Sequence, residues 1–310
     1  MEIINGFGKT IEKSVVAIGF FDGVHIGHRE LIKKAVSLSR EKCIPSVVYT
    51  FSSHPVRTLF PDKEVSYITA NEQKAEIFES LGVDLLVFDD FSRVKDLPPA
   101  LFVENVLVKS LGAEAVVCGY NFKFGKDNAG DIDTLSSLLS TFGRRLFVIP
   151  PVCAGDNPIS SALIRSLLKE GEVDTALKLL GKPFSIKGQV VHGHHLGHEL
   201  GFPTANVDFF EDSVTLKRGV YYTKTLFDGK EYLSVTNIGI RPTVDDGQSE
   251  SVCETHIIGL DSDIYSKTIE VSFYKFARCE MKFSSFECLS EMLLKDVENC
   301  KNYFGKEEEK

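Results

Sequence analysis

The chain has 310 residues, of which 43% are hydrophobic and 25% charged, and it carries a formal net charge of −9 at pH 7. This composition excludes a largely disordered chain, and the length is sufficient for two domains with separate cores. The negative net charge argues against non-specific nucleic-acid binding, which needs a basic surface. The sequence shows no signal-peptide pattern and no membrane-spanning apolar run, so we expect a cytoplasmic protein without a membrane partner.

Strands and helices are predicted to alternate through the N-terminal half. The apolar run Val15–Ile18 is typical of a buried strand, and apolar residues then recur at helical spacing from His28 onward. Further strands are predicted at 46–51, 83–88, 115–118 and 145–149, and helices at 71–81, 98–111 and 131–142. Regularly spaced strands separated by helices indicate parallel βαβ units, so this half should form a doubly wound α/β domain.

The turn after the first predicted strand, residues 19–28, reads Gly-Phe-Phe-Asp-Gly-Val-His-Ile-Gly-His. Its glycines permit positive φ and close backbone approach, and the N-terminus of the following helix favours an anion. His25 and His28 can donate hydrogen bonds to phosphate oxygens and stabilise charge that develops during attack on phosphorus. This predicts a phosphate site, which residues 119–125 should also face; a glycine-rich turn with two incidental histidines is the alternative.

The pattern changes in the C-terminal half. From 183 to 273 the chain consists of short β-branched and aromatic segments separated by turns such as Asp228-Gly229, which predicts an all-β domain. Helices are expected before it, through Arg165 and over 172–180. A capping box at 284–287 and the apolar stripe after it predict a closing helix that packs on the β domain. The seven cysteines include no Cys-x-x-Cys pair and are expected to be reduced and mostly buried.

The segment 190–206 is the richest in the β half, because it holds His192, His194, His195 and His198 among several glycines. Zinc sites use histidine ligands, but no carboxylate shell is evident here. We favour a glycine-bearing flap that folds over nucleotide phosphates, followed by Thr204 and Asn206 as oxygen ligands for Mg²⁺. In isolation, a polar turn into a strand would be the preferred explanation of Pro-Thr-Ala-Asn.

These motifs resemble those of a known family. Residues 19–28 are similar to the His-x-Gly-His signature of nucleotidylyltransferases and to the opening of the flavin adenylyltransferase module of bacterial bifunctional riboflavin kinase/FAD synthetases. Residues 193–206 resemble the Gly-x-x-x-Gly-Arg-x-Leu-Gly-Phe-Pro-Thr-Ala-Asn signature of riboflavin kinases, and the similarity continues through 219–221, 237–239 and 241–243. The resemblance covers nearly the whole chain.

The resemblance implies two domains and two reactions. Residues 1–181 would form a Rossmann-like FMN adenylyltransferase domain, and residues 182–310 a riboflavin kinase β-barrel with a closing helix. The kinase would convert riboflavin to FMN with ATP, and the N-terminal domain would convert FMN to FAD with release of pyrophosphate. Both steps would need Mg²⁺. The partners would be the small molecules ATP, riboflavin and FMN, and the oligomeric state is left open.

The resemblance also implies roles for individual residues. The catalytic residues would be His25, His28 and Arg165 in adenylyl transfer, and Glu254 as the base for the riboflavin 5′-hydroxyl. A surface carboxylate is the alternative for Glu254. The residues implied in ATP binding are Gly19, Phe20, Asp22, Gly23, Asn121, Gly193, Gly197 and His198; those in flavin binding are Asn121 and Arg278; and those in Mg²⁺ binding are Thr204 and Asn206.

Two positions depart from the family pattern. His198 stands where arginine is usual, so a fixed charge in the flap becomes dependent on pH. Ala162 replaces a threonine, which removes one hydrogen bond worth about 0.5–1.5 kcal/mol. We expect attenuation rather than loss of activity. The rival interpretations are another nucleotidylyltransferase that shares only the His-x-Gly-His turn, and a flavin-binding regulator that has lost turnover.

Overall fold

The computed structural model describes residues 1–6, 10–60, 62, 65–191, 202–209, 212–242 and 249–308. Its contacts divide the chain into two compact units, Met1–Ser161 and Ala162–Lys310. The sequence analysis places the domain boundary between residues 181 and 182, after helices α6 (Ser161–Glu170) and α7 (Val173–Leu180). The contacts instead group nearly all of α6 and the whole of α7 with the second unit.

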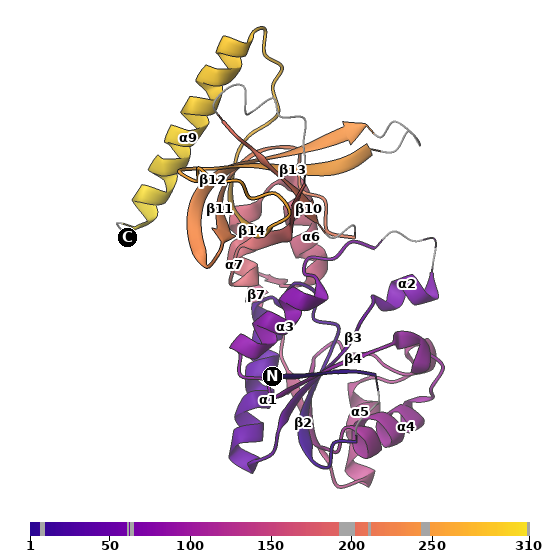
Figure 1. Cartoon of the computed structure of the whole chain (residues 1–310). Coiled ribbons are helices and arrows are strands. Elements are labelled where there is room, and N and C mark those ends of the chain that lie inside the picture. The colour runs from indigo at the N-terminus through magenta and orange to yellow at the C-terminus, as the bar shows by residue number, and fades with distance from the viewer. Residues whose placement is uncertain are drawn as a thin grey trace. The chain divides into compact units, whose positions relative to one another are not determined.

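The first unit contains a parallel sheet with the order β1-β4-β3-β2-β5-β6 (Figure 1). Its strands are β1 (Glu2–Asn5), β2 (Ser14–Ile18), β3 (Ser46–Phe51), β4 (Leu85–Asp89), β5 (Ala113–Gly119) and β6 (Arg145–Ile149). The central strands are apolar runs because helices cover both faces of the sheet. The predicted doubly wound α/β fold is therefore confirmed.

Helices form a layer on each face of this sheet. Helices α1 (Ile26–Lys42) and α3 (Asn71–Ser80) supply the core of one face, and η3 (Phe102–Ser110) and α5 (Ile132–Thr141) that of the other. The helix predicted over 98–111 is a short α-turn, α4 (Pro99–Leu101), that continues into the π-helix η3. The remaining short elements are η1 (Asp22–Val24), α2 (Pro55–Leu59), η2 (Phe91–Arg93), η4 (Lys126–Asn128), β7 (Cys153–Ala154) and β8 (Asn157–Pro158).

The second unit contains a closed antiparallel barrel with the order β10-β13-β12-β11-β14-β9. Its strands are β9 (Phe184–Val191), β10 (Ala205–Phe209), β11 (Gly219–Phe227), β12 (Lys230–Pro242), β13 (Ser249–Ile257) and β14 (Thr268–Arg278). Asp228 and Gly229 join β11 to β12, and both have positive φ, 48° and 73°. This geometry suits a tight hairpin turn, as predicted.

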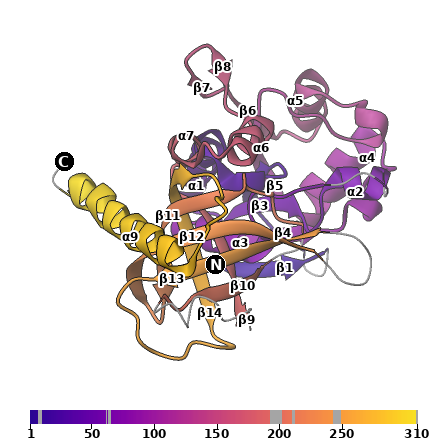
Figure 2. The same cartoon turned by 90° about the horizontal axis from the view of Figure 1, so that it is seen from above.

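The closing helix α9 (Phe286–Glu308) lies along the outside of the barrel (Figures 1 and 2). Cys300 and Phe304 are buried there against Val220 and Val235, which point outward from β11 and β12. Within the described ranges, no helix is both long and apolar enough to cross a membrane. Each of the seven cysteines is free. Only Cys118, Cys253 and Cys300 are buried, so the expectation that most of the cysteines are buried is wrong.

Candidate active sites

A pocket of about 550 Å³ opens in the first unit at the carboxyl ends of β2 and β5. These neighbouring strands mark the point where the strand order reverses, since β3 and β4 lie beyond β2 and β6 lies beyond β5. Ligands of open α/β sheets bind at this position. The lining includes five of the residues predicted for adenylyl transfer, namely Gly19, Phe20, His25, His28 and Asn121.

The turn that carries the two histidines has an unusual backbone. Phe21 and Val24 adopt positive φ, 55° and 39°, although neither is a glycine. Such conformations cost roughly 1–3 kcal/mol each and persist only where the surroundings enforce them. Phe21 is buried, and its ring meets that of Phe78 in α3 edge-on at 5.7 Å. Packing against α3 therefore helps to hold the strained turn.

Asp22 and Gly23 do not line this pocket. The Asp22 carboxylate is buried, and its Oδ1 accepts hydrogen bonds from the backbone N–H groups of Ile68, at 2.9 Å, and Thr69, at 3.3 Å. Its backbone carbonyl accepts a hydrogen bond of 2.8 Å from the Ser161 hydroxyl. In the described structure, Asp22 thus ties the turn to the segment that precedes α3.

His25 and His28 stack on each other, with ring centroids 3.6 Å apart and planes inclined by 16°. Nδ1 of His25 accepts a hydrogen bond of 3.3 Å from the backbone N–H of His28 and so caps α1. Gly27 leaves room for this arrangement, because a Cβ there would lie 3.2 Å from the His25 ring.

Both imidazoles are held neutral. Burial lowers the pKa of His25 to about 4. Burial also places the pKa of His28 well below its usual value, and the charges of His25 and Lys74 lower it further. Because Nδ1 of His25 accepts a hydrogen bond, its single proton must lie on Nε2. His25 therefore acts as a neutral donor whose charge state is stable at physiological pH.

The strand register of the barrel gathers the residues predicted for the kinase. Asn206 on β10 lies directly opposite Glu254 on β13, and Glu254 lies opposite Asn237 on β12. Residues that face each other across adjacent strands project to the same side, so these three side chains share the outer face of the barrel.

The interior of the barrel holds the alternate residues. Thr255, next to Glu254, is fully buried and accepts a hydrogen bond of 2.9 Å from the Thr236 hydroxyl. This bond belongs to a network of buried hydroxyl groups, which joins Thr223, Thr225, Ser234, Thr236 and Thr255. The hydroxyl network therefore fixes which face Glu254 presents.

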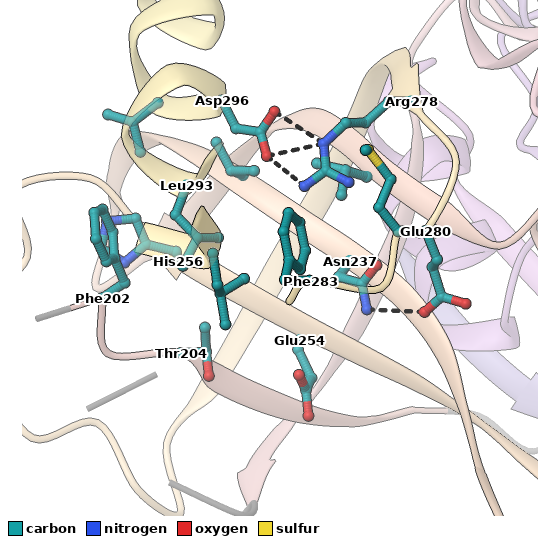
Figure 3. Close-up of a pocket in the computed structure, with 15 residues that line it drawn as sticks. Phe202, Thr204, Asn237, Glu254, His256, Arg278, Glu280, Phe283, Leu293 and Asp296 are labelled. Carbon is teal, nitrogen blue, oxygen red and sulfur yellow. Dashed lines mark hydrogen bonds and ion pairs between the residues drawn. The ribbon is translucent and has the colours of Figure 1, made fainter. Parts of the chain in front are cut away.

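A pocket of about 260 Å³ lies between the outer face of the barrel and α9 (Figure 3). Thr204 and Glu254 lie at one end of it, and Arg278 and Asp296 at the other. Its walls are largely apolar, from Phe202, Val220, Val235, Met281, Phe283, Leu289, Leu293 and Val297. A flat ring system with few polar groups would suit these walls.

Arg278, predicted to bind flavin, is held by Asp296 of α9. Its Nη2 donates to Asp296 Oδ2 at 2.7 Å and its Nε to both carboxylate oxygens at 3.2 Å, while Nη1 donates to the Cys279 carbonyl at 3.1 Å. The side chains of Arg278 and Asp296 are 19% and 5% exposed. Gly219 permits this course of β14, because a Cβ there would lie 2.3 Å from the Arg278 carbonyl oxygen. The ion pair thus joins the barrel to α9 at the wall of the pocket.

A second pocket, of about 480 Å³, adjoins the first, and Thr204 lines both. Asp261 and Asp263 are among its polar lining residues. Asn206 lines neither pocket, but it lies opposite Glu254 in the strand register, and its Oδ1 is buried without a hydrogen-bond partner. An unsatisfied oxygen on the residue that faces Glu254 fits a hard cation such as Mg²⁺.

The other residues predicted for this half are placed less completely. Gly193, Gly197 and His198, and the other histidines of that segment, lie outside the described residues. The described ranges contain no cluster of three or more His, Cys, Asp or Glu side chains able to hold a metal. Arg165 lies in α6, in the second unit.

Comparison with known proteins accounts for both units. Residues 8–163 match the family model described as FAD synthetase, and residues 180–304 match that described as riboflavin kinase. The chain belongs to the bifunctional riboflavin kinase/FMN adenylyltransferases. It phosphorylates riboflavin with ATP to give FMN, and it adenylylates FMN with ATP to give FAD and pyrophosphate; Mg²⁺ is typical of the family.

Two curated bifunctional riboflavin kinase/FMN adenylyltransferases are similar over nearly their full length. The one from Listeria monocytogenes is 38% identical, covering 95% of this chain and 94% of that protein. The one from Bacillus subtilis is 35% identical, covering 94% and 93%. A crystal structure described as a macrolide-efflux protein from Streptococcus pneumoniae has a TM-score of 0.90 and 30% identity, covering 97% of this chain and 99% of that one.

Several residues around the two sites of this bifunctional enzyme were not predicted individually. Lys123 and Ser160 line the pocket at the carboxyl ends of β2 and β5, and His256 and Asp296 line the pocket beside α9. Lys123 falls within residues 119–125, and Ser160 lies two residues before Ala162, so their neighbours in the sequence were the available clues. Nothing in the sequence singled out Asp296, because an acidic residue in a surface helix is usually solvated.

Proposed function

We propose that adenylyl transfer takes place in the pocket at the carboxyl ends of β2 and β5, and riboflavin phosphorylation in the paired pockets that meet at Thr204. The FAD synthetase match contains every lining residue of the first pocket, and the riboflavin kinase match contains every lining residue of the other two. The observation that carries the kinase assignment is that Thr204 lines both neighbouring pockets.

In adenylyl transfer the phosphate of FMN is itself the nucleophile, so no protein base is required. His25 and His28 would orient phosphate oxygens with hydrogen bonds from neutral imidazoles, and these donors are already fixed by stacking and burial. Donors positioned before reaction stabilise developing charge without reorganisation. Gly19, Phe20 and Asn121 would contact the nucleotide or the flavin at the pocket wall.

The remaining predicted residues have indirect or separate roles in this proposal. Asp22 and Gly23 would act by shaping the turn, since they lie outside the pocket lining. Arg165 would neutralise phosphate charge. We retain residues 1–181 and 182–310 as the two functional domains. Neither family match covers residues 164–179, and helices α6 and α7 make up most of that interval.

In the kinase, the apolar pocket beside α9 would hold riboflavin and the pocket beside Asp261 would hold ATP. Thr204, shared by both, would then lie where the 5′-hydroxyl meets the γ-phosphate. Glu254, on the same face, would accept the proton of that hydroxyl. Thr204 and Asn206 would hold Mg²⁺, which neutralises phosphate charge during phosphoryl transfer.

We place Arg278 in flavin binding through the wall of the pocket, with its guanidinium fixed by Asp296. Gly193, Gly197 and His198 are proposed to cover the ATP phosphates. Since both reactions consume ATP, we propose that the protein works in the cytoplasm.

The test compares the products that the parent, His28→Ala and Glu254→Gln form from riboflavin or FMN with ATP and Mg²⁺, separated by chromatography. His28→Ala should form FMN at a near-normal rate but no FAD. Glu254→Gln should form no FMN from riboflavin, yet should form FAD from added FMN. Parallel loss of both products in either folded variant would contradict two separate sites, and unchanged kinase turnover in Glu254→Gln would remove Glu254 from the role of base.

A further inference from the structure

Lys74 is an unusual residue in the adenylyltransferase unit. It lies in the first turn of α3, its side chain is fully buried, and its Nζ has no hydrogen-bond partner. An isolated buried charge is strongly unfavourable, and a cation near a helix N-terminus also opposes the helix dipole. A methionine would fill the same space without either cost.

The ammonium lies directly behind the histidine turn. Nζ is 4.3 Å from the centroid of the Phe20 ring, and Phe20 lines the pocket whereas Lys74 does not. Burial lowers the pKa of both His28 and Lys74; in addition, Lys74 lowers the pKa of His28 and Asp22 raises that of Lys74. Burial lowers the pKa of Lys74 to about 8, so the side chain is still mainly charged at neutral pH.

The nearest acid does not cancel this charge by direct pairing. Oδ1 of Asp22 accepts hydrogen bonds from the backbone of Ile68 and Thr69, and Nζ of Lys74 makes none. The two neutral imidazoles bring no net charge to the pocket. A ligand with several negative charges in the pocket would thus be attracted by an ammonium that water does not screen.

We propose that Lys74 is a positioning residue of the adenylyltransferase, whose buried positive charge behind Phe20 strengthens the hold of the histidine turn on the phosphate groups of ATP and FMN. The inference rests on the proposed placement of adenylyl transfer in this pocket. Lys74 does not line the pocket, so it acts through the turn and through its field rather than by contact.

The experiment uses Lys74→Met in the full chain, with Lys33→Met as the matched control. Lys33 lies in α1 with a 58% exposed side chain, so its replacement removes the same charge from the surface. For Lys74→Met, kcat/KM for FAD formation from FMN should fall about tenfold or more, mainly through higher KM values for ATP and FMN. FMN formation by the kinase unit should stay within about twofold of the parent, as should both activities of Lys33→Met.

The melting temperature distinguishes this role from a packing role. If the charge is kept for ligand binding, Lys74→Met should melt at or above the temperature of the parent while FAD formation falls. Unchanged FAD formation would overturn the inference, and so would a fall in both FAD formation and melting temperature. His28→Ala in the same series separates the two claims, because retained FAD formation in that variant would refute the proposed site itself.

Discussion

The buried charge of Lys74 has a direct thermodynamic consequence that calorimetry can measure. In the folded chain burial lowers its pKa from 10.5 to about 8. Below pH 8 the lysine is charged in both the folded and the unfolded state, and the folded state alone bears the cost of burying the charge. At about 1.4 kcal/mol for each pKa unit, that cost is about 3 kcal/mol. It disappears as the pH rises from 8 to 10.5, because the folded state releases its proton first.

Lys74→Met removes this titration and leaves every other group in place. We therefore compare the free energy of unfolding of Lys74→Met with that of the parent at each pH. The variant's value minus the parent's value should be about 3 kcal/mol larger at pH 7 than at pH 10.5. For a unit of this size that difference corresponds to a shift of about 6–12 °C in melting temperature. Differential scanning calorimetry of both proteins at several pH values measures it. A difference between the two proteins that does not change with pH would refute the reasoning.

Three further outcomes are expected. Asp296→Asn breaks a buried ion pair and should destabilise the kinase unit by about 3–5 kcal/mol and raise the KM for riboflavin, whereas FAD formation from FMN should not change; denaturant unfolding and product assays measure this. Asn206→Ala should raise the Mg²⁺ concentration needed for half-maximal FMN formation, measured by titration of Mg²⁺, and an unchanged midpoint would exclude Asn206 as a ligand. The pKa of His25 is lowered from 6.5 to about 4 in the folded chain, so the unfolded chain binds a proton first as the pH falls. The free energy of unfolding should therefore drop by about 3 kcal/mol between pH 6.5 and pH 4, and acid unfolding of His25→Asn should lack this drop.

Much of the fold could be predicted from the sequence, because buried parallel strands appear as uninterrupted apolar runs. The predicted strands at 46–51 and 145–149 have the bounds of β3 and β6. Strand β1 escaped prediction, since its four residues lie at the edge of the sheet and three of them are exposed. The π-helix η3 escaped it too, because π and α periodicity are too close to separate over so few residues.

The sites were predicted as far as local motifs reach. Residues 19–28 indicated a phosphate site because glycines, an acid and two histidines fall within one turn. The partners of Asp22 could not be read from that turn, since its carboxylate binds backbone groups of Ile68 and Thr69, far along the chain. Lys74 was equally hidden, because a lysine in a helix is normally read as part of the solvated face.

The alternation of β13 limits how this enzyme can change by insertion or deletion. Glu254 faces the kinase pocket only because Thr255 is committed to the hydroxyl network inside the barrel. Since the side-chain period of a strand is two, one residue added or removed within β13 would exchange the two faces. A carboxylate would then enter the barrel, and a threonine would take the place of Glu254 in the pocket beside α9. We therefore expect natural length variation in relatives to fall in the loops around this strand, and the distance along the chain from Glu254 to Ile257 to stay constant.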